Sequence, residues 1–287
     1  MFIPIVFIFL IFSFIFQILC PSDVFAWGPG VHTVIALNIL SDVSLILPSI
    51  AEIITAFPVE YLYGCLAADF FVGKSRMKKA GRAHNWQGGL KLLGEAGDVQ
   101  EKAYAYGFLS HLAADVVAHN IFVPNMISEY RAIRKRSHLY WEIRADYLVG
   151  PEYTKIARGV LAMDHYICDN LLRSITGKRK KAIGARKLIF TQSVKFSDRA
   201  YTTRHVLFPF KRIDHRGFDE YGAVMIGLTL RVVNGFLRYP ESSACLLHDP
   251  IGLRNLYLAK QSTSLIRLFR TKRPSKSFPV DQRLLKL

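Results

Sequence analysis

The segment from Glu101 to His119 constrains the fold most, because it combines an apolar helical repeat with three polar residues on one face. His111, Asp115 and His119 are each four residues apart, a spacing that places side chains on the same side of an α-helix. Three polar groups on a buried helix cost on the order of several kcal/mol unless they find partners. A bound metal would partner all three together, and a hydrogen-bonded polar core is the alternative interpretation.

Other residues of metal-ligand type flank this helix in the chain. The full ordered set is Trp27, His32, Asp69, His84, His111, Asp115, His119, His138 and Glu142. Imidazole and carboxylate groups on facing helices are how helical proteins build metal sites in a core. Taken alone, His32 is more typical of a surface or capping histidine, and His138 with Glu142 is typical of an ordinary salt-bridge pair. The ordered set as a whole predicts a zinc enzyme.

The first residues of the chain give Trp27 its place in this set. Residues 2–19 are almost wholly apolar, and Val24 and Ala26 occupy the small-residue positions that signal peptidase reads. We therefore expect residues 1–26 to be a signal peptide, with the protein exported and secreted or periplasmic. Cleavage after Ala26 would give Trp27 a free amine, which together with its carbonyl oxygen can chelate a metal.

Two alternatives leave the protein associated with a membrane. The apolar segment is long enough to remain as an uncleaved anchor, and it lacks the Lys or Arg expected at the start of a signal peptide. A lipoprotein anchored through Cys20 is the second alternative, with bulky Leu19 standing where a small residue is expected.

Composition indicates one basic domain over residues 27–287, with a basic tail at about 254–287. The formal net charge of +16 favours anionic partners, such as a phospholipid or membrane surface or nucleic acid, and a solvated basic face is the alternative. Without Cys20, the three cysteines Cys65, Cys168 and Cys245 allow at most one disulfide, so we expect most of them to be buried small residues. The oligomeric state is left open.

Hydrophobic periodicity is helical nearly throughout and predicts an all-α, multi-helix bundle. The expected helices cover residues 32–40, 44–56, 85–95, 101–119, 128–148, 154–172 and 221–237. Asp69 is expected in a loop after a helix end, and Pro58 is expected to stop the second helix. The 221–237 helix contains Arg231 and is expected to be buried rather than to span a membrane.

Several short motifs together carry a family resemblance. They are Trp27-Gly-Pro-Gly-Val-His32, Ala68-Asp69-Phe-Phe-Val-Gly-Lys74, His84-Asn-Trp86, Gly107-Phe-Leu-Ser-His111-Leu-Ala-Ala-Asp115-Val-Val-Ala-His119-Asn120 and His138-Leu-Tyr-Trp-Glu142. In this order they resemble the bacterial zinc-dependent phospholipase C family. That family shares its helical fold and three-zinc site with the single-strand-specific zinc nucleases of fungi and plants. The motifs are also similar to the N-terminal domain of glycosylphosphatidylinositol-specific phospholipase D.

The resemblance implies a trinuclear zinc site in the core with a definite division of ligands. One zinc would be held by the Trp27 amine and carbonyl with His32 and Asp115. The second would be held by Asp69, His84, His111 and the other oxygen of Asp115, which bridges the pair. The third would be held by His119, His138 and Glu142, with positions left for water. The spacing from Asp115 to His119 is shorter than in the best-known secreted members and is nearer to the phospholipase D relative.

The implied activity is hydrolysis of a phosphodiester by a hydroxide shared between two zincs, with Asp69 also orienting the attacking water. A phospholipase C that releases diacylglycerol and a phosphorylated headgroup is the leading hypothesis. A single-strand nuclease is the second, favoured by the basic charge and the available aromatic residues. A non-catalytic, membrane-associated zinc scaffold is the third, favoured if residues 1–26 stay attached. The headgroup and the choice between C-type and D-type cleavage are left open.

Overall fold

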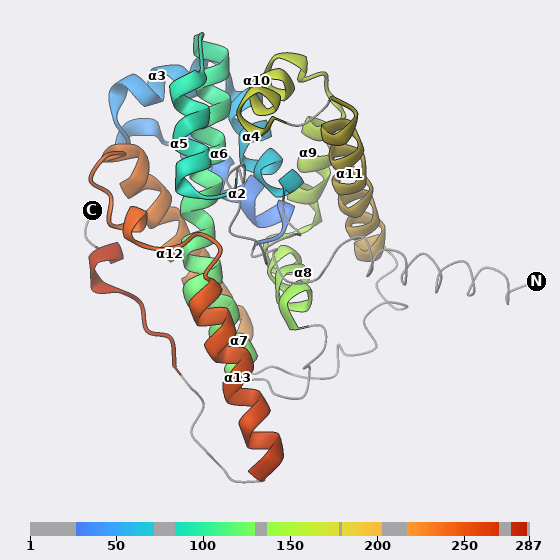
Figure 1. The fold of residues 1–287 in the computed structure, drawn as a ribbon, viewed down its shortest axis with the longest axis vertical. Coiled ribbons are helices and arrows are strands. Elements are labelled where there is room, and N and C mark those ends of the chain that lie inside the picture. The colour runs from blue at the N-terminus through green and yellow to red at the C-terminus, as the bar shows by residue number, and fades with distance from the viewer. Residues whose placement is uncertain are drawn as a thin grey trace, which may run out of the picture.

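The computed structural model describes residues 27–71, 84–129, 137–177, 180–202, 217–269 and 277–285. Every regular element in these ranges is a helix, which confirms the predicted all-α, multi-helix fold (Figure 1). In chain order the elements are α2 (Pro29–Ser41), η1 (Val43–Leu45), α3 (Pro48–Ala56), α4 (Pro58–Ala67), η2 (Ala68–Phe71), α5 (Trp86–Glu95), α6 (Val99–Val117), η3 (Ala118–Phe122), α7 (Val123–Glu129), α8 (Ser137–Val149), α9 (Pro151–Ala162), α10 (Tyr166–Thr176), α11 (Lys180–Thr202), α12 (Phe218–Arg238), η6 (Ala244–Leu247), α13 (Leu253–Phe269) and η7 (Gln282–Leu285).

Helix α6 is the axis of the bundle, and α3, α4, α5 and α12 pack against it (Figure 1). Two glycines bring α4 and α6 together backbone to backbone. A Cβ at Gly64 would clash with the Tyr104 carbonyl oxygen and lie 2.8 Å from the Phe108 nitrogen, and a Cβ at Gly107 would clash with the Tyr61 carbonyl. This close approach places the C-terminal end of α4 beside the middle of α6, where His111 lies.

The predicted helix over 101–119 continues without a break into η3, a π-helical turn, and then into α7. Pro124 has no amide hydrogen, so it cannot bond to the carbonyl of Asn120 as a helical residue would. The side chain of Asn255, from α13, donates to that carbonyl at 3.0 Å instead. The wider turn therefore has a local cause, and such turns are frequent at functional sites.

Several predicted helix boundaries were wrong. The single helix expected over 154–172 is two helices, α9 and α10, because the ring of His165 bonds the Val160 carbonyl at 2.7 Å and ends α9. The helix expected over 44–56 starts only at Pro48, and Pro58 starts α4 as well as ending α3, since proline favours the first helical position. The helix expected over 128–148 corresponds to the end of α7 and to α8, with residues 130–136 outside the described part.

Two long helices were not predicted, α11 and α13. Helix α11 packs on α9 and η2, and α13 packs on α7 and η3, so both support elements that carry expected ligands. Cys65, Cys168 and Cys245 are all buried, as expected for most of them, and all three are free thiols. The expected signal peptide, residues 1–26, lies outside the described residues.

Among the described helices, no single one is long and apolar enough to cross a membrane. The pair Pro48–Ala56 and Pro58–Phe70, bent by 95°, reaches that length and hydropathy only when both members are counted together.

Candidate metal centre

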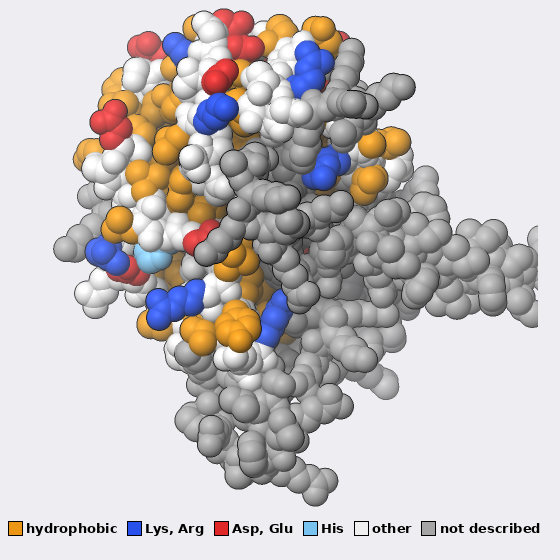
Figure 2. Space-filling view, in the orientation of Figure 1, with side chains coloured by type: hydrophobic (Ala, Val, Ile, Leu, Met, Phe, Trp, Pro, Cys, Tyr) orange, Lys and Arg blue, Asp and Glu red, His pale blue; other side chains and the backbone are white. Residues whose placement is uncertain are grey.

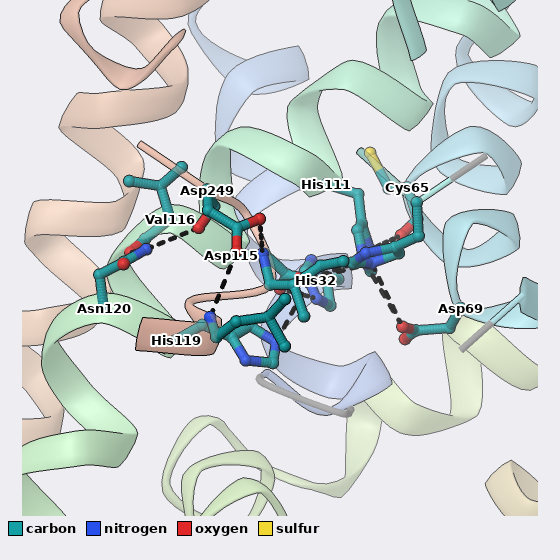
Figure 3. A network of polar contacts seen from close by, with 12 residues as sticks. His32, Cys65, Asp69, His111, Asp115, Val116, His119, Asn120 and Asp249 are labelled. Carbon is teal, nitrogen blue, oxygen red and sulfur yellow. Dashed lines mark hydrogen bonds and ion pairs between the residues drawn. The ribbon is translucent and has the colours of Figure 1, made fainter. Parts of the chain in front are cut away.

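The carboxylate of Asp115 lies at the centre of the polar cluster and is 1% exposed (Figure 3). Its Oδ1 faces His32 Nε2 at 3.4 Å, and its Oδ2 lies 3.1 Å from both His84 Nε2 and His111 Nε2. His119 Nε2 lies 3.8 Å from Oδ2 of Asp115. One carboxylate is thus shared by imidazoles from α2, α6, η3 and the residues before α5.

Asp69 closes the cluster from the opposite side (Figure 3). It is held in η2, the tight turn that directly continues α4, rather than in a loop as expected. Its Oδ1 lies 3.5 Å from His111 Nε2 and 4.0 Å from His84 Nε2. The Nε2 atoms of His84 and His111 are themselves only 2.9 Å apart, so two nitrogens and two carboxylates converge on one small volume.

The backbone of α4 selects the tautomer of the central imidazole in its neutral form. His111 Nδ1 donates to the carbonyl of Cys65 at 2.8 Å, so the neutral ring presents the lone pair of Nε2 to the cluster. The ring of His32 stacks on that of His111, with centroids 3.9 Å apart, and this holds His32 in place. Both contacts orient the Nε2 atoms of His111 and His32 toward the cluster.

Burial and mutual charge give these groups shifted pKa values. Burial lowers the pKa of His32 to about 4 and that of His119 to about 3, and burial raises the pKa of Asp69 to about 6. Burial is the largest single effect on Asp115 and on His111 and opposes their charged forms, but the charges and hydrogen bonds of the neighbouring groups together outweigh it. The pKa of Asp115 is therefore held well below its usual range, and that of His111 is raised to about 9.

The residues present fit zinc. Among the described residues, His32 Nε2 and Asp115 Oδ1 are buried without a hydrogen-bond partner, an arrangement that is costly in a metal-free core. Two sets of side chains have ligand atoms within 4.8 Å of one another: His32, Asp69 and His111, and His84, His111 and Asp115. Imidazole nitrogens with carboxylate oxygens are the usual donor set for zinc in enzymes.

A family model described as zinc-dependent phospholipase C matches residues 31–184, more than half of the chain. The chain belongs to the zinc-dependent phospholipase C family. Searches of curated proteins and of solved structures each found no match. The match includes every expected ligand except Trp27, and it supports a zinc-binding hydrolase.

The remaining expected ligands of this phospholipase C-family protein surround the cluster less directly. Glu142 is buried in α8, and burial, followed by the charges of Asp69 and Asp115, raises its pKa well above its usual range. Trp27 is fully buried, and its ring stacks on Phe122 of η3 at 4.5 Å.

His138 belongs to the first turn of α8, but its side chain lies outside the described part of the chain. The division of the ligands among three zinc ions therefore stays a prediction.

One buried carboxylate near the site was not among the residues predicted from the sequence to have a role. Asp146 of α8 is 1% exposed, and its Oδ1 accepts a hydrogen bond from the amide of Val31 at 2.9 Å. Burial raises the pKa of Asp146 to about 7, against the opposing effect of hydrogen bonds from the amides of Val31 and Gly30. The sequence signal for Asp146 is its spacing of four from Glu142, the same spacing that relates the expected ligands on α6.

Proposed function

We propose that this protein is an exported zinc-dependent phosphodiesterase that hydrolyses phospholipids between the glycerol and the phosphate. The products would be diacylglycerol and a phosphorylated headgroup. The observation that carries the proposal is the position of Asp115, whose Oδ1 faces His32 and whose Oδ2 faces His84 and His111. Together with the family match, a carboxylate placed between two donor sets supports a shared-metal hydrolase.

Different residues of the chain would have different roles around the substrate phosphate. Zinc, when bound, supplies Lewis acidity, lowers the pKa of water and offsets negative charge on the phosphate. His32, His84, His111 and Asp115 would hold it on the α2 and α6 side, and His119, His138 and Glu142 would hold it on the α8 side.

Asp69 would have a second role beside ligation. Its carboxylate faces His111 at the edge of the cluster, where it can accept a hydrogen bond from an attacking water and orient it. The described core around the cluster is largely apolar, so these contacts are stronger than they would be in bulk solvent.

We also propose a phospholipid surface as the partner. Exposed Leu247, Leu253 and Tyr257 lie at η6 and on α13, with Arg254 and Lys260 exposed on the same helix. In Figure 2, basic and apolar side chains lie next to each other beside the start of α13. Apolar side chains flanked by positive charge suit the boundary between anionic headgroups and acyl chains. The inner side of α13 packs on η3, which carries His119.

Product analysis on phosphatidylcholine micelles tests the activity. Zinc-loaded protein is assayed as the full chain and as a chain that begins at Trp27. We expect phosphocholine and diacylglycerol, and we expect a chelator or Asp115→Asn to lower turnover by at least about 100-fold. His165→Gln is the matched control, because His165 is buried as deeply as the cluster histidines but bonds the Val160 carbonyl instead.

Other products would indicate a different activity. Choline with phosphatidic acid would make the enzyme D-type, and cleavage of single-stranded DNA without lipid turnover would make it a nuclease. N-terminal sequencing of protein recovered outside the cytoplasm tests export separately, and a first residue of Trp27 is the expected result.

A further inference from the structure

The N-terminus of α2 has no capping side chain of its own. Its N-cap residue is Gly28, and Pro29 follows at the first helical position. The amides at the start of a helix need acceptors, which an N-cap side chain usually supplies to the second or third helical residue. Here the carboxylate of Asp146, 115 residues further along the chain, accepts from the third helical residue, Val31.

Two glycines are fitted around this carboxylate. A Cβ at Gly28 would lie 2.5 Å from Asp146 Oδ1 and still closer to the rest of the carboxylate, and a Cβ at Gly30 would lie 3.0 Å from the same oxygen. Any side chain at position 28 would therefore displace Asp146. In the motif Trp27-Gly-Pro-Gly-Val-His32, the two glycines thus leave space for the Asp146 carboxylate. This is separate from the expected metal binding by Trp27 and His32.

The same segment carries the first expected ligands. The amide of His32 donates to the carbonyl of Gly28 at 3.2 Å and closes the first turn of α2. His32 Nε2 then faces Asp115 at 3.4 Å. A shift of the helix start would therefore move His32 and the preceding Trp27 together.

Asp146 also links this segment to α8. It follows Glu142 by four residues, so the two carboxylates lie on neighbouring positions of one helical face. Both are buried. Among the described residues, Asp146 has the backbone amides of Val31 and Gly30 but no cationic side chain as partner, which fits a cap for a helix N-terminus.

We propose that Asp146 is a positioning residue for zinc binding: it caps α2 from α8 and holds Trp27 and His32 at the distance from Asp115 that a metal ion requires. It does not bind the metal itself. The inference rests on the proposed function only in taking His32 as a zinc ligand. It predicts that this carboxylate fixes the start of α2 against α8, in addition to the direct packing of the two helices.

Zinc affinity of the full chain, measured by competition with a coloured chelator, is the first readout. Asp146→Ala is expected to weaken the binding of part of the zinc by about 10- to 100-fold, as loss of a ligand-orienting group usually does. Asp146→Asn keeps one acceptor for the Val31 amide and is expected to retain most of the affinity. Cobalt substitution gives a second readout, because the visible spectrum reports ligand geometry and should change in the alanine variant.

A double-mutant cycle separates positioning from general destabilisation. Gly28→Ala alone should weaken zinc binding, because its methyl group displaces the Asp146 carboxylate. In the Asp146→Ala background that methyl group has room, so the second substitution should cost little further affinity. Gly227→Ala, with nothing within 4 Å of the added Cβ, is the neutral control.

The outcomes distinguish this inference from the proposed function. Unchanged zinc affinity and an unchanged cobalt spectrum in folded Asp146→Ala would overturn the positioning role, as would additive losses in the cycle. If Asp146→Ala does not fold, Gly28→Ala and Asp146→Asn decide the question by the same readouts. A wild-type chain that binds zinc but hydrolyses no phospholipid would contradict the proposed function. The effect of Asp146→Ala on zinc affinity could still be measured in that case.

Discussion

The backbone of Gly252 lies directly against His119: a Cβ at Gly252 would be 2.6 Å from both the carbonyl carbon and the Cβ of His119. Gly252 precedes α13 and lies well beyond residues 31–184, the range of the family match. The C-terminal part of the chain therefore packs against the segment that carries His119. Asn120, the next residue after His119, is held on the same side by the Asp249 carbonyl, to which it donates at 2.8 Å.

Gly252→Ala should move His119 and lower both zinc content and phospholipid turnover, the latter by at least about tenfold. Gly252 has a φ of +60°, so alanine also carries backbone strain at this position. Gly177→Ala is the matched control, because Gly177 has the same φ of +60° with nothing within 4 Å of the added Cβ. Equal zinc content in the two variants would contradict the role given to Gly252.

Gly64→Ala and Gly107→Ala should each destabilise the fold by at least about 2 kcal/mol, because each added methyl group meets the backbone of the facing helix. Separation of α4 from α6 would also lengthen the hydrogen bond between His111 and the Cys65 carbonyl. Urea unfolding measures the first effect and zinc affinity the second. Gly159→Ala, on an exposed helical position with nothing within 4 Å, should instead stabilise by about 0.5–1 kcal/mol.

Removal of zinc should lower the thermal midpoint of the full chain. Zinc at about 1,000 times its Kd contributes about 4 kcal/mol, and for a chain of this size that corresponds to roughly 10 °C. Calorimetry with and without a chelator measures the shift, and Asp115→Asn should show a much smaller one. An unchanged midpoint in the unsubstituted chain would argue against a metal in the core.

His165 should make the protein less stable in acid. Burial lowers the pKa of His165 below its usual 6.5, so the unfolded chain binds more protons than the folded chain as the pH falls through 6.5. The free energy of unfolding should therefore decrease toward low pH, and His165→Gln should remove part of that decrease. Urea titrations of both proteins between about pH 8 and pH 5 provide the comparison. Parallel curves for the two proteins would exclude His165 as a contributor.

The sequence by itself determined the fold class and the candidate ligands. Spacings of four within one helix, as in His111, Asp115 and His119, are local geometry and need no knowledge of distant contacts. The ordered motifs from Trp27 to Glu142 indicated the family for the same reason, since each motif is a short stretch of chain.

Tertiary structure alone decided which residues support the ligands. The cap that Asp146 gives to α2, the contact of Gly252 with His119 and the approach of Gly64 to α6 all join segments far apart in the chain. Such contacts depend on how helices pack, and packing at close range depends on the absence of a Cβ at single positions. Helix boundaries were missed for a similar reason: the ring of His165 ends α9 through a side-chain bond to the Val160 carbonyl that no hydrophobic period encodes.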